Sequence, residues 1–182
     1  MDLERSPLAL PFPDLADIEG AELRIARAQY KEWDRADLTF VTLVEGTSVA
    51  GVFTKSACAS SEVELGREQV KRGTARALVI NAGNANAFTG YRGRDAVEMI
   101  MEQVAGHLGC HPGQVFVSST GVSGVPLPQD RARKGLNAVF DAPQCKWEDA
   151  AKAISTTDTF PKGATTRAVI GEKTVTLSGI IK

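Results

Sequence analysis

The short segment Ala75–Ile80 constrains the fold most, because it is apolar on both faces of an extended chain. Such a strand is stable only when it is buried between two layers. An amphipathic helix follows it, predicted from about Asp95 to Leu108 and ended by Gly109. Its apolar residues recur at helical spacing: Val97, Ile100, Met101, Val104 and Leu108. The chain therefore combines buried strands with helices that cover them.

The remaining patterns predict a mixed α/β fold of layered sheets and helices, a single domain over residues 1–182. Three prolines in residues 6–20 indicate that residues 1–20 form an extended lead-in. Ser61 and Glu64 predict a capping box that begins a helix toward Arg72. Strands are expected at 23–28, 38–44, 49–54 and 114–117, with 38–54 as a hairpin, further helices at 128–140 and 146–154, and a closing hairpin of 168–170 and 174–177.

Composition excludes several classes of protein. With 21 basic and 22 acidic residues the net charge is −1, so no electrostatic feature favours nucleic acid or an anionic membrane. The longest apolar run, Ala77–Ile80, is too short to cross a bilayer. The three cysteines lack the spacing of a disulfide framework, and the start has no signal-peptide pattern, so we expect a cytoplasmic protein.

The sequence Ser-Ser-Thr-Gly-Val-Ser-Gly at 118–124 follows a predicted strand. A hydroxyl and a backbone N–H at a strand end can stabilise an oxyanion, although the same residue types form ordinary turns. A serine hydrolase is the alternative, with Ser118, Ser119 or Ser123 as nucleophile, and only His107 and His111 could then serve as the base.

Two further stretches could contact ligands. The Asn/Gly-rich stretch 81–90 could bind an anion through its N–H groups, as in a non-enzymatic ligand-binding module, or could simply adopt left-handed backbone conformations. The stretch Thr156–Thr159 contains three hydroxyls and a carboxylate in four residues. It is a candidate substrate contact, or it is only a helix end and turn. His107, Cys110 and His111 lack a fourth ligand at the spacing usual for zinc, so no metal site is predicted.

The chain contains five motifs in this order: Gly51–Lys55, Val79–Ala87, Ser118–Val122, Thr156–Thr159 and Gly179–Lys182. In this combination the chain resembles the ornithine acetyltransferase (glutamate N-acetyltransferase) family of arginine biosynthesis. The resemblance covers the chain from about Phe12 to Lys182, and the order of the motifs makes it specific.

The resemblance implies that this is the α chain of a precursor that cuts itself into two chains. The N-terminal threonine of the β chain is then the nucleophile, Thr120 and Gly121 form the oxyanion hole, and Thr156 and Lys182 contact the substrate. The family moves acetyl from N2-acetylornithine to glutamate as an α2β2 heterotetramer without a cofactor, and some members also use acetyl-CoA as donor. The chain ends directly after a predicted strand, which we interpret as the product of cleavage.

Overall fold

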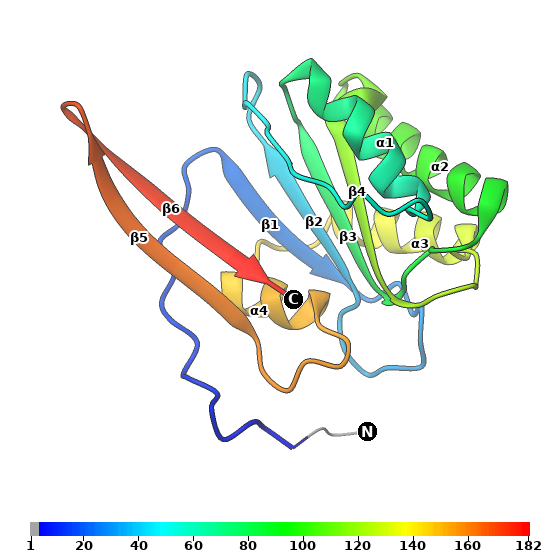
Figure 1. Ribbon diagram of the computed structural model, residues 1–182, viewed down its shortest axis with the longest axis horizontal. Helices are drawn as coiled ribbons and strands as arrows, with labels where there is room; N and C mark the ends of the chain where they lie inside the picture. The colour runs from blue at the N-terminus through cyan, green and yellow to red at the C-terminus, as the bar shows by residue number, and fades with distance from the viewer. Residues whose placement is uncertain (1–3) are drawn as a thin grey trace.

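The computed structural model describes residues 4–182 and confirms a mixed α/β fold (Figure 1). Its main sheet has four strands in the order β1-β2-β3-β4. Pairing is antiparallel between β1 and β2 and between β2 and β3, and parallel between β3 and β4. The strands are β1 (Ala21–Ala26), β2 (Leu38–Leu43), β3 (Ala77–Asn84) and β4 (Val115–Val122). The strands β1, β3 and β4 therefore run in the same direction, and their C-terminal ends lie at the same end of the sheet.

Helices cover both faces of this sheet. The main core packs α2 (Gly90–Leu108) and α3 (Gln129–Phe140) on the sheet face that carries Leu38 and Phe40. The helix α1 (Ser61–Gln69), extended by a 3₁₀ turn at Val70–Arg72, packs beside α2 and β4. After α3 the chain passes the outer edge of β1, where the Cys145 N–H donates to the Leu23 carbonyl. The last helix, α4 (Trp147–Ile154), then lies against β1, β2 and β3.

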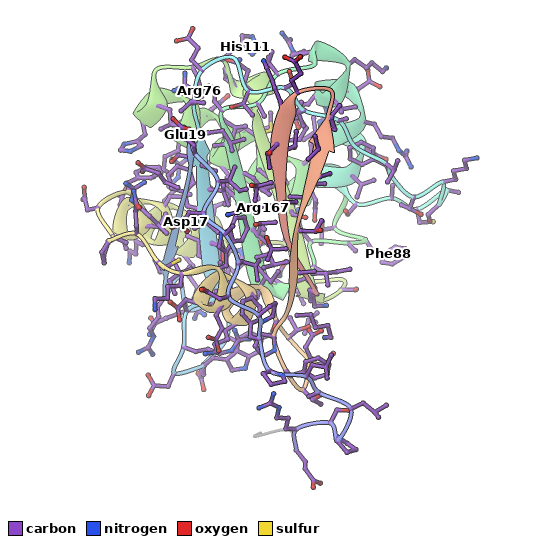
Figure 2. All side chains as sticks on the ribbon, turned by 90° about the vertical axis from the view of Figure 1, so that its left-hand side faces the viewer. Asp17, Glu19, Arg76, Phe88, His111 and Arg167 are labelled. Atoms are coloured by element: carbon purple, nitrogen blue, oxygen red, sulfur yellow. The ribbon has the colours of Figure 1, made fainter. Side chains whose placement is uncertain are left out.

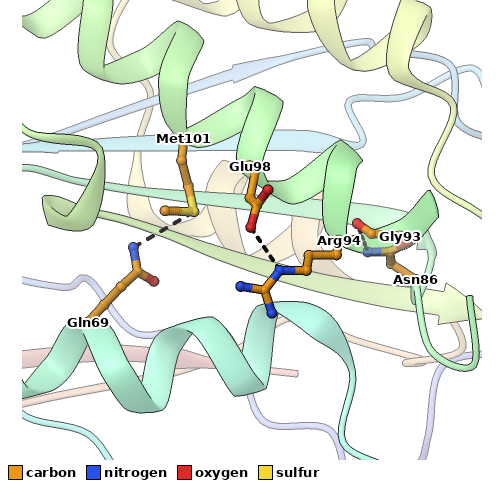
Figure 3. A network of polar contacts seen from close by, with 6 residues as sticks. All are labelled: Gln69, Asn86, Gly93, Arg94, Glu98 and Met101. Atoms are coloured by element: carbon orange, nitrogen blue, oxygen red, sulfur yellow. Dashed lines mark hydrogen bonds and ion pairs between the residues drawn. The ribbon is translucent and has the colours of Figure 1, made fainter. Parts of the chain in front are cut away.

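Glutamine and asparagine side chains fasten α1, α2 and the sheet to one another (Figure 3). Gln69 of α1 donates to the Val115 carbonyl at 2.7 Å and lies 3.8 Å from the Met101 sulfur. Asn86, just after β3, donates to the Gly93 carbonyl of α2 at 3.0 Å. A buried amide without a hydrogen-bond partner destabilises the fold, so these bonds also help to fix the positions of α1 and α2 on the sheet.

A second sheet consists of β5 (Lys162–Ile170) and β6 (Lys173–Ile181), which form an antiparallel hairpin. Figure 1 shows its turn projecting away from the main sheet. The predicted closing hairpin is confirmed and is longer than expected. Several apolar side chains on it are exposed, Val169 by 73% and Leu177 by 51%. The base of the hairpin contacts α4, and Ser178 donates to the Ala16 carbonyl in the lead-in at 2.8 Å.

The predicted hairpin over 38–54 is wrong. β2 lies inside the sheet, where β1 and β3 occupy both of its edges, so residues 49–54 have no free edge with which to pair. They form no strand, and Val52 is 99% exposed. Only Ser48 makes an isolated bridge, to Thr74.

Other element boundaries also differ from those predicted from the sequence. The strands β3 and β4 continue through Asn84 and Val122, residues expected to form a loop and a turn, because parallel pairing continues past the apolar segment. The helix α2 begins at Gly90 rather than at Asp95, and Gly109 ends it with φ 64° as expected. The capping box at Ser61 is wrong, because Ser60 is the N-cap of α1 and makes no side-chain cap bond. Residues 7–20 contain no helix or strand.

None of the helices within residues 4–182 combines the length and the apolar character needed to cross a bilayer.

Candidate functional site

Thr120 and Gly121 lie near the end of β4, where Gly121 is in close contact with the Gly83–Asn84 backbone of β3. Gly121 has φ 134°, and a Cβ there would lie 2.6 Å from the Asn84 nitrogen and 2.7 Å from the Gly83 Cα. Only glycine fits this backbone and this spacing. The register between the two strands shifts at Gly83 and Asn84, so Thr120 is opposite both Ala82 and Asn84. Such a shift turns backbone groups away from the regular ladder.

Three buried asparagines hold the end of β3 and the residues after it. Asn81 donates to the Asn84 carbonyl at 2.8 Å and accepts from the Ser119 hydroxyl at 2.7 Å. The side-chain carbonyl of Asn84 accepts from the Asn86 N–H at 2.8 Å, and its amide donates to the Val125 carbonyl at 2.8 Å. These bonds tie β3, β4 and the chain after β4 together around Gly121.

Asn86 carries the network on to α1 and α2. It has φ 50°, a left-handed conformation that asparagine tolerates, as the sequence led us to expect of this loop. Its amide donates to Glu62 Oε2 at 3.3 Å, and its carbonyl accepts from the Leu127 N–H at 3.3 Å. Burial raises the pKa of Glu62, while its own backbone N–H, the Ser119 hydroxyl and Asn86 oppose that rise. Glu62 is thus a buried carboxyl held beside the strand that carries Thr120.

These bonds argue against anion binding by the Asn/Gly-rich stretch. The Ala82 N–H donates to the Asp37 carbonyl, the Ala85 N–H to the Val122 carbonyl and the Asn86 N–H to Asn84. An anion cradle needs several N–H groups that point at one open position. The asparagines of this stretch are therefore structural, which weakens the hypothesis of a ligand-binding module.

The serine hydrolase hypothesis fails on geometry. The imidazole of His107 is stacked on Phe140 with ring centroids 3.9 Å apart. His111 accepts from the Gly113 N–H at 2.9 Å, beside the start of β4, whereas the serines lie at the other end of that strand. Figure 2 shows His111 at the top of the molecule and Phe88, from the stretch after β3, well below it. Neither histidine makes a hydrogen bond to a serine of 118–124 within residues 4–182.

The carboxylate of Asp158 lies in the turn between α4 and β5, which also contains Thr156. Asp158 accepts from the Thr156 N–H at 3.3 Å and from the Lys162 ammonium at 2.6 Å. Burial raises the pKa of Asp158, but the Lys162 and Thr156 bonds and the charges of Lys162 and Lys182 outweigh it, so the pKa lies below its usual value. The structure thus places Thr156 in the turn after α4 and Lys182 beyond β6, beside the start of β5, because Ile181 pairs with Lys162. Thr120 and Gly121 lie together in β4.

Sequence reasoning singled out the motif that contains Asp158 for its hydroxyls and its carboxylate, but it missed the pairing of Asp158 with Lys162. It also missed the loop between β1 and β2, whose Lys31 and Trp33 lie against Gly83. No periodic pattern marks that loop. Within residues 4–182, no group of three or more histidine, cysteine or acidic residues is arranged to hold a metal ion, and His107, Cys110 and His111 form no such group.

The ArgJ family model matches residues 22–182, so the chain belongs to the ArgJ family. The arginine biosynthesis bifunctional protein ArgJ of Zymomonas mobilis subsp. mobilis is 52% identical over 178 residues, which cover 97% of this chain and 44% of that protein. ArgJ of Mesorhizobium japonicum is 45% identical over 179 residues, covering 97% and 43%. The chain therefore spans less than half the length of the curated relatives it matches.

Two crystal structures are similar to this fold. ArgJ from Bacillus halodurans matches with a TM-score of 0.81 and 27% identity, covering 90% of this chain and 86% of that chain. Ornithine acetyltransferase from Mycobacterium tuberculosis, solved in complex with ornithine, matches with a TM-score of 0.82 and 28% identity, covering 90% and 88%. These findings confirm the family and the fold class expected from the motifs.

The close approach at Gly121 generates a first prediction. We expect Gly121→Ala to lower the free energy of unfolding by more than about 2 kcal/mol, because the new Cβ would overlap the Gly83–Asn84 backbone. Chemical denaturation of the full-length protein measures this. Gly124→Ala is the matched control, since Gly124 also has a positive φ but no atom within 4 Å of its Cβ position. Equal losses in the two variants would contradict the role of close packing.

The Asp158 cluster generates a second prediction, on pH. A carboxyl whose pKa is lowered on folding stabilises the protein above its unfolded pKa, about 3.9, and this stabilisation is lost as the pH falls through the folded pKa. We therefore expect Asp158→Asn to lower the melting temperature at pH 7, with a deficit that shrinks below about pH 4. Asp34→Asn is the control, because its carboxylate is 95% exposed. A deficit that stays constant or grows on acidification would contradict the prediction.

Proposed function

We propose that this chain is the α chain of a two-chain acyltransferase that moves acetyl from N2-acetylornithine to glutamate, with acetyl-CoA as a second donor where the enzyme is bifunctional. The observation that carries the proposal is the Thr120–Gly121 pair, placed where only glycine fits against β3. Membership of the ArgJ family and the likeness to an ornithine acetyltransferase support it. No cofactor is needed for this chemistry, and we expect the enzyme to act in the cytoplasm.

In the proposed mechanism, the nucleophile is the N-terminal threonine of the β chain. Its α-amine takes the hydroxyl proton as the oxygen attacks the acetyl carbonyl of N2-acetylornithine. The Thr120 hydroxyl and the Gly121 N–H donate to the resulting oxyanion. Collapse of the tetrahedral intermediate releases ornithine, which takes the proton, and leaves an acetyl-threonine. The amine of glutamate attacks this ester, and the bond between the acetyl carbon and the threonine oxygen breaks to release N-acetylglutamate. The proton lost by the glutamate amine passes to the threonine oxygen and regenerates the hydroxyl.

The Asp158 turn supplies the substrate contacts. Lys162 already neutralises Asp158 at 2.6 Å, so the exposed ammonium of Lys182 remains to pair with a substrate carboxylate. The hydroxyl of Thr156 lies in the same turn and can bond the amino-acid part of the substrate. Ornithine and glutamate both carry an α-carboxylate, so one such position can serve donor and acceptor in turn.

The partner that we propose is the β chain of the same precursor, in an α2β2 heterotetramer. The share of each relative that this chain covers supports the proposal. The match covers 86% and 88% of the two solved chains but only 44% of the Zymomonas mobilis protein. Exposed apolar side chains on β5 and β6, among them Ile170 and Ile181, are suited to burial against another chain.

Thr120→Ala in the full-length protein tests the function. The oxyanion is stabilised only in the transition state, so we expect kcat for acetyl transfer to fall about 100-fold while KM changes little. Steady-state assays with N2-acetylornithine and glutamate measure both constants.

The control is Ser118→Ala, which removes an exposed hydroxyl from the same strand and should leave kcat unchanged. An unaltered kcat in Thr120→Ala would contradict the proposal. A loss confined to Ser118→Ala would instead favour a serine nucleophile.

A further inference from the structure

The loop between β1 and β2, residues 27–37, is held in one conformation by Asp37. This carboxylate is 1% exposed and accepts from the Ala28 N–H at 2.6 Å and the Tyr30 N–H at 2.7 Å. The loop contains no helix or strand, yet these charge-assisted bonds to its backbone restrict it strongly. Trp33 and Arg35 follow this anchored part of the loop and contact each other.

On one side, Trp33 packs against β3, the strand that pairs with the Thr120–Gly121 segment of β4. A Cβ at Gly83 would lie 3.5 Å from Cζ3 of Trp33, so the indole rests over the Gly83 backbone. Gly83 pairs with Gly121 in the β3–β4 ladder, and a Cβ at Gly121 would lie 2.7 Å from the Gly83 Cα. Trp33 therefore contacts the residue that pairs with Gly121.

On the other side, Arg35 reaches the end of α4. Its Nη2 donates to the Ser155 carbonyl at 2.6 Å, and its Nη1 lies 3.1 Å from the Lys152 carbonyl and 3.4 Å from the Ala153 carbonyl. A guanidinium here satisfies the free carbonyls at the helix C-terminus and interacts favourably with the helix dipole. Ser155 directly precedes Thr156, so Arg35 fixes the start of the turn that carries the proposed substrate contact.

The two sides are joined within the loop. The guanidinium carbon of Arg35 lies 4.1 Å from the centre of the Trp33 ring, a cation–π contact. Contacts therefore run without a break from Thr156 through Ser155, Arg35, Trp33 and Gly83 to Gly121.

We propose that Arg35 is a positioning residue for acetyl transfer: through Ser155 and Trp33 it sets the Thr156 turn at the correct distance from the Thr120–Gly121 pair. This inference rests on the proposed function. Substrate held by the turn must present its carbonyl to the oxyanion donors, and an error of about 1 Å in such placement can cost on the order of 100-fold in rate. Lysine keeps the charge but lacks the planar fork that bonds several carbonyls and stacks on the indole.

The test is a double-mutant cycle in the full-length protein, with Arg35→Lys, Thr156→Ala and both together. We expect Arg35→Lys to lower kcat about tenfold, and to have much less effect once Thr156 is alanine, because Arg35 acts through that turn. Arg94→Lys is the matched control, since Arg94 is a half-exposed arginine on α2 that is paired to Glu98 at 2.8 Å. It should leave kcat unchanged. Trp33→Leu, which removes the stacked ring but not the hydrogen bonds of Arg35, should also lower kcat.

Three outcomes would overturn the inference. One is an unchanged kcat in Arg35→Lys and Trp33→Leu, even with a lower melting temperature, since this would make Arg35 a helix cap only. Another is additivity of the Arg35 and Thr156 substitutions. The third is a wild-type protein without acetyl transfer, which would remove the proposed function as well. An active wild-type enzyme with normal Arg35→Lys kinetics would remove the positioning role alone.

Discussion

The parallel pairing of β3 with β4 is the constraint on which the rest of the structure depends. It brings Gly121 so close to the Gly83–Asn84 backbone that β4 tolerates no side chain at the contact, and it ends with a register shift at Asn84. Buried asparagines occupy the polar positions that this shift creates, and each one bonds to a different segment. The same irregularity lies at Thr120 and Gly121, the residues that we propose as oxyanion donors.

The site is assembled from segments far apart in the sequence, and each is secured by a different interaction. Close backbone packing holds Gly121, a nearly buried carboxylate at Asp158 holds the turn of Thr156, and the guanidinium of Arg35 connects that turn to the loop beside Gly83. Lys182 directly follows β6, beside the start of β5. A site built in this way can place an oxyanion donor and a carboxylate-binding cation on separate elements and still fix their separation.

Much of the fold was predictable, because local patterns and packing agree there. The apolar spacing of α2 and the left-handed Gly109 that ends it follow from the sequence, as does the β5–β6 hairpin. The polar ends of β3 and β4 were not predictable from local sequence. Asn81 and Ser119 favour turns locally, and they adopt strand conformation because they pair with each other in the β3–β4 ladder. The motifs indicated Thr120 and Thr156 individually. The roles of Asp158 and Arg35 depend on contacts across the fold that no local pattern records.

The central claim is that this chain supplies the oxyanion donors to a threonine nucleophile on a second chain cut from the same precursor. Intact-mass spectrometry and N-terminal sequencing of the purified full-length protein, before and after incubation with N2-acetylornithine, test it most directly. The account predicts two chains, the second beginning with threonine and gaining one acetyl group, while this chain gains none. A single uncut chain, or an acetyl group on a residue of this chain, would contradict it.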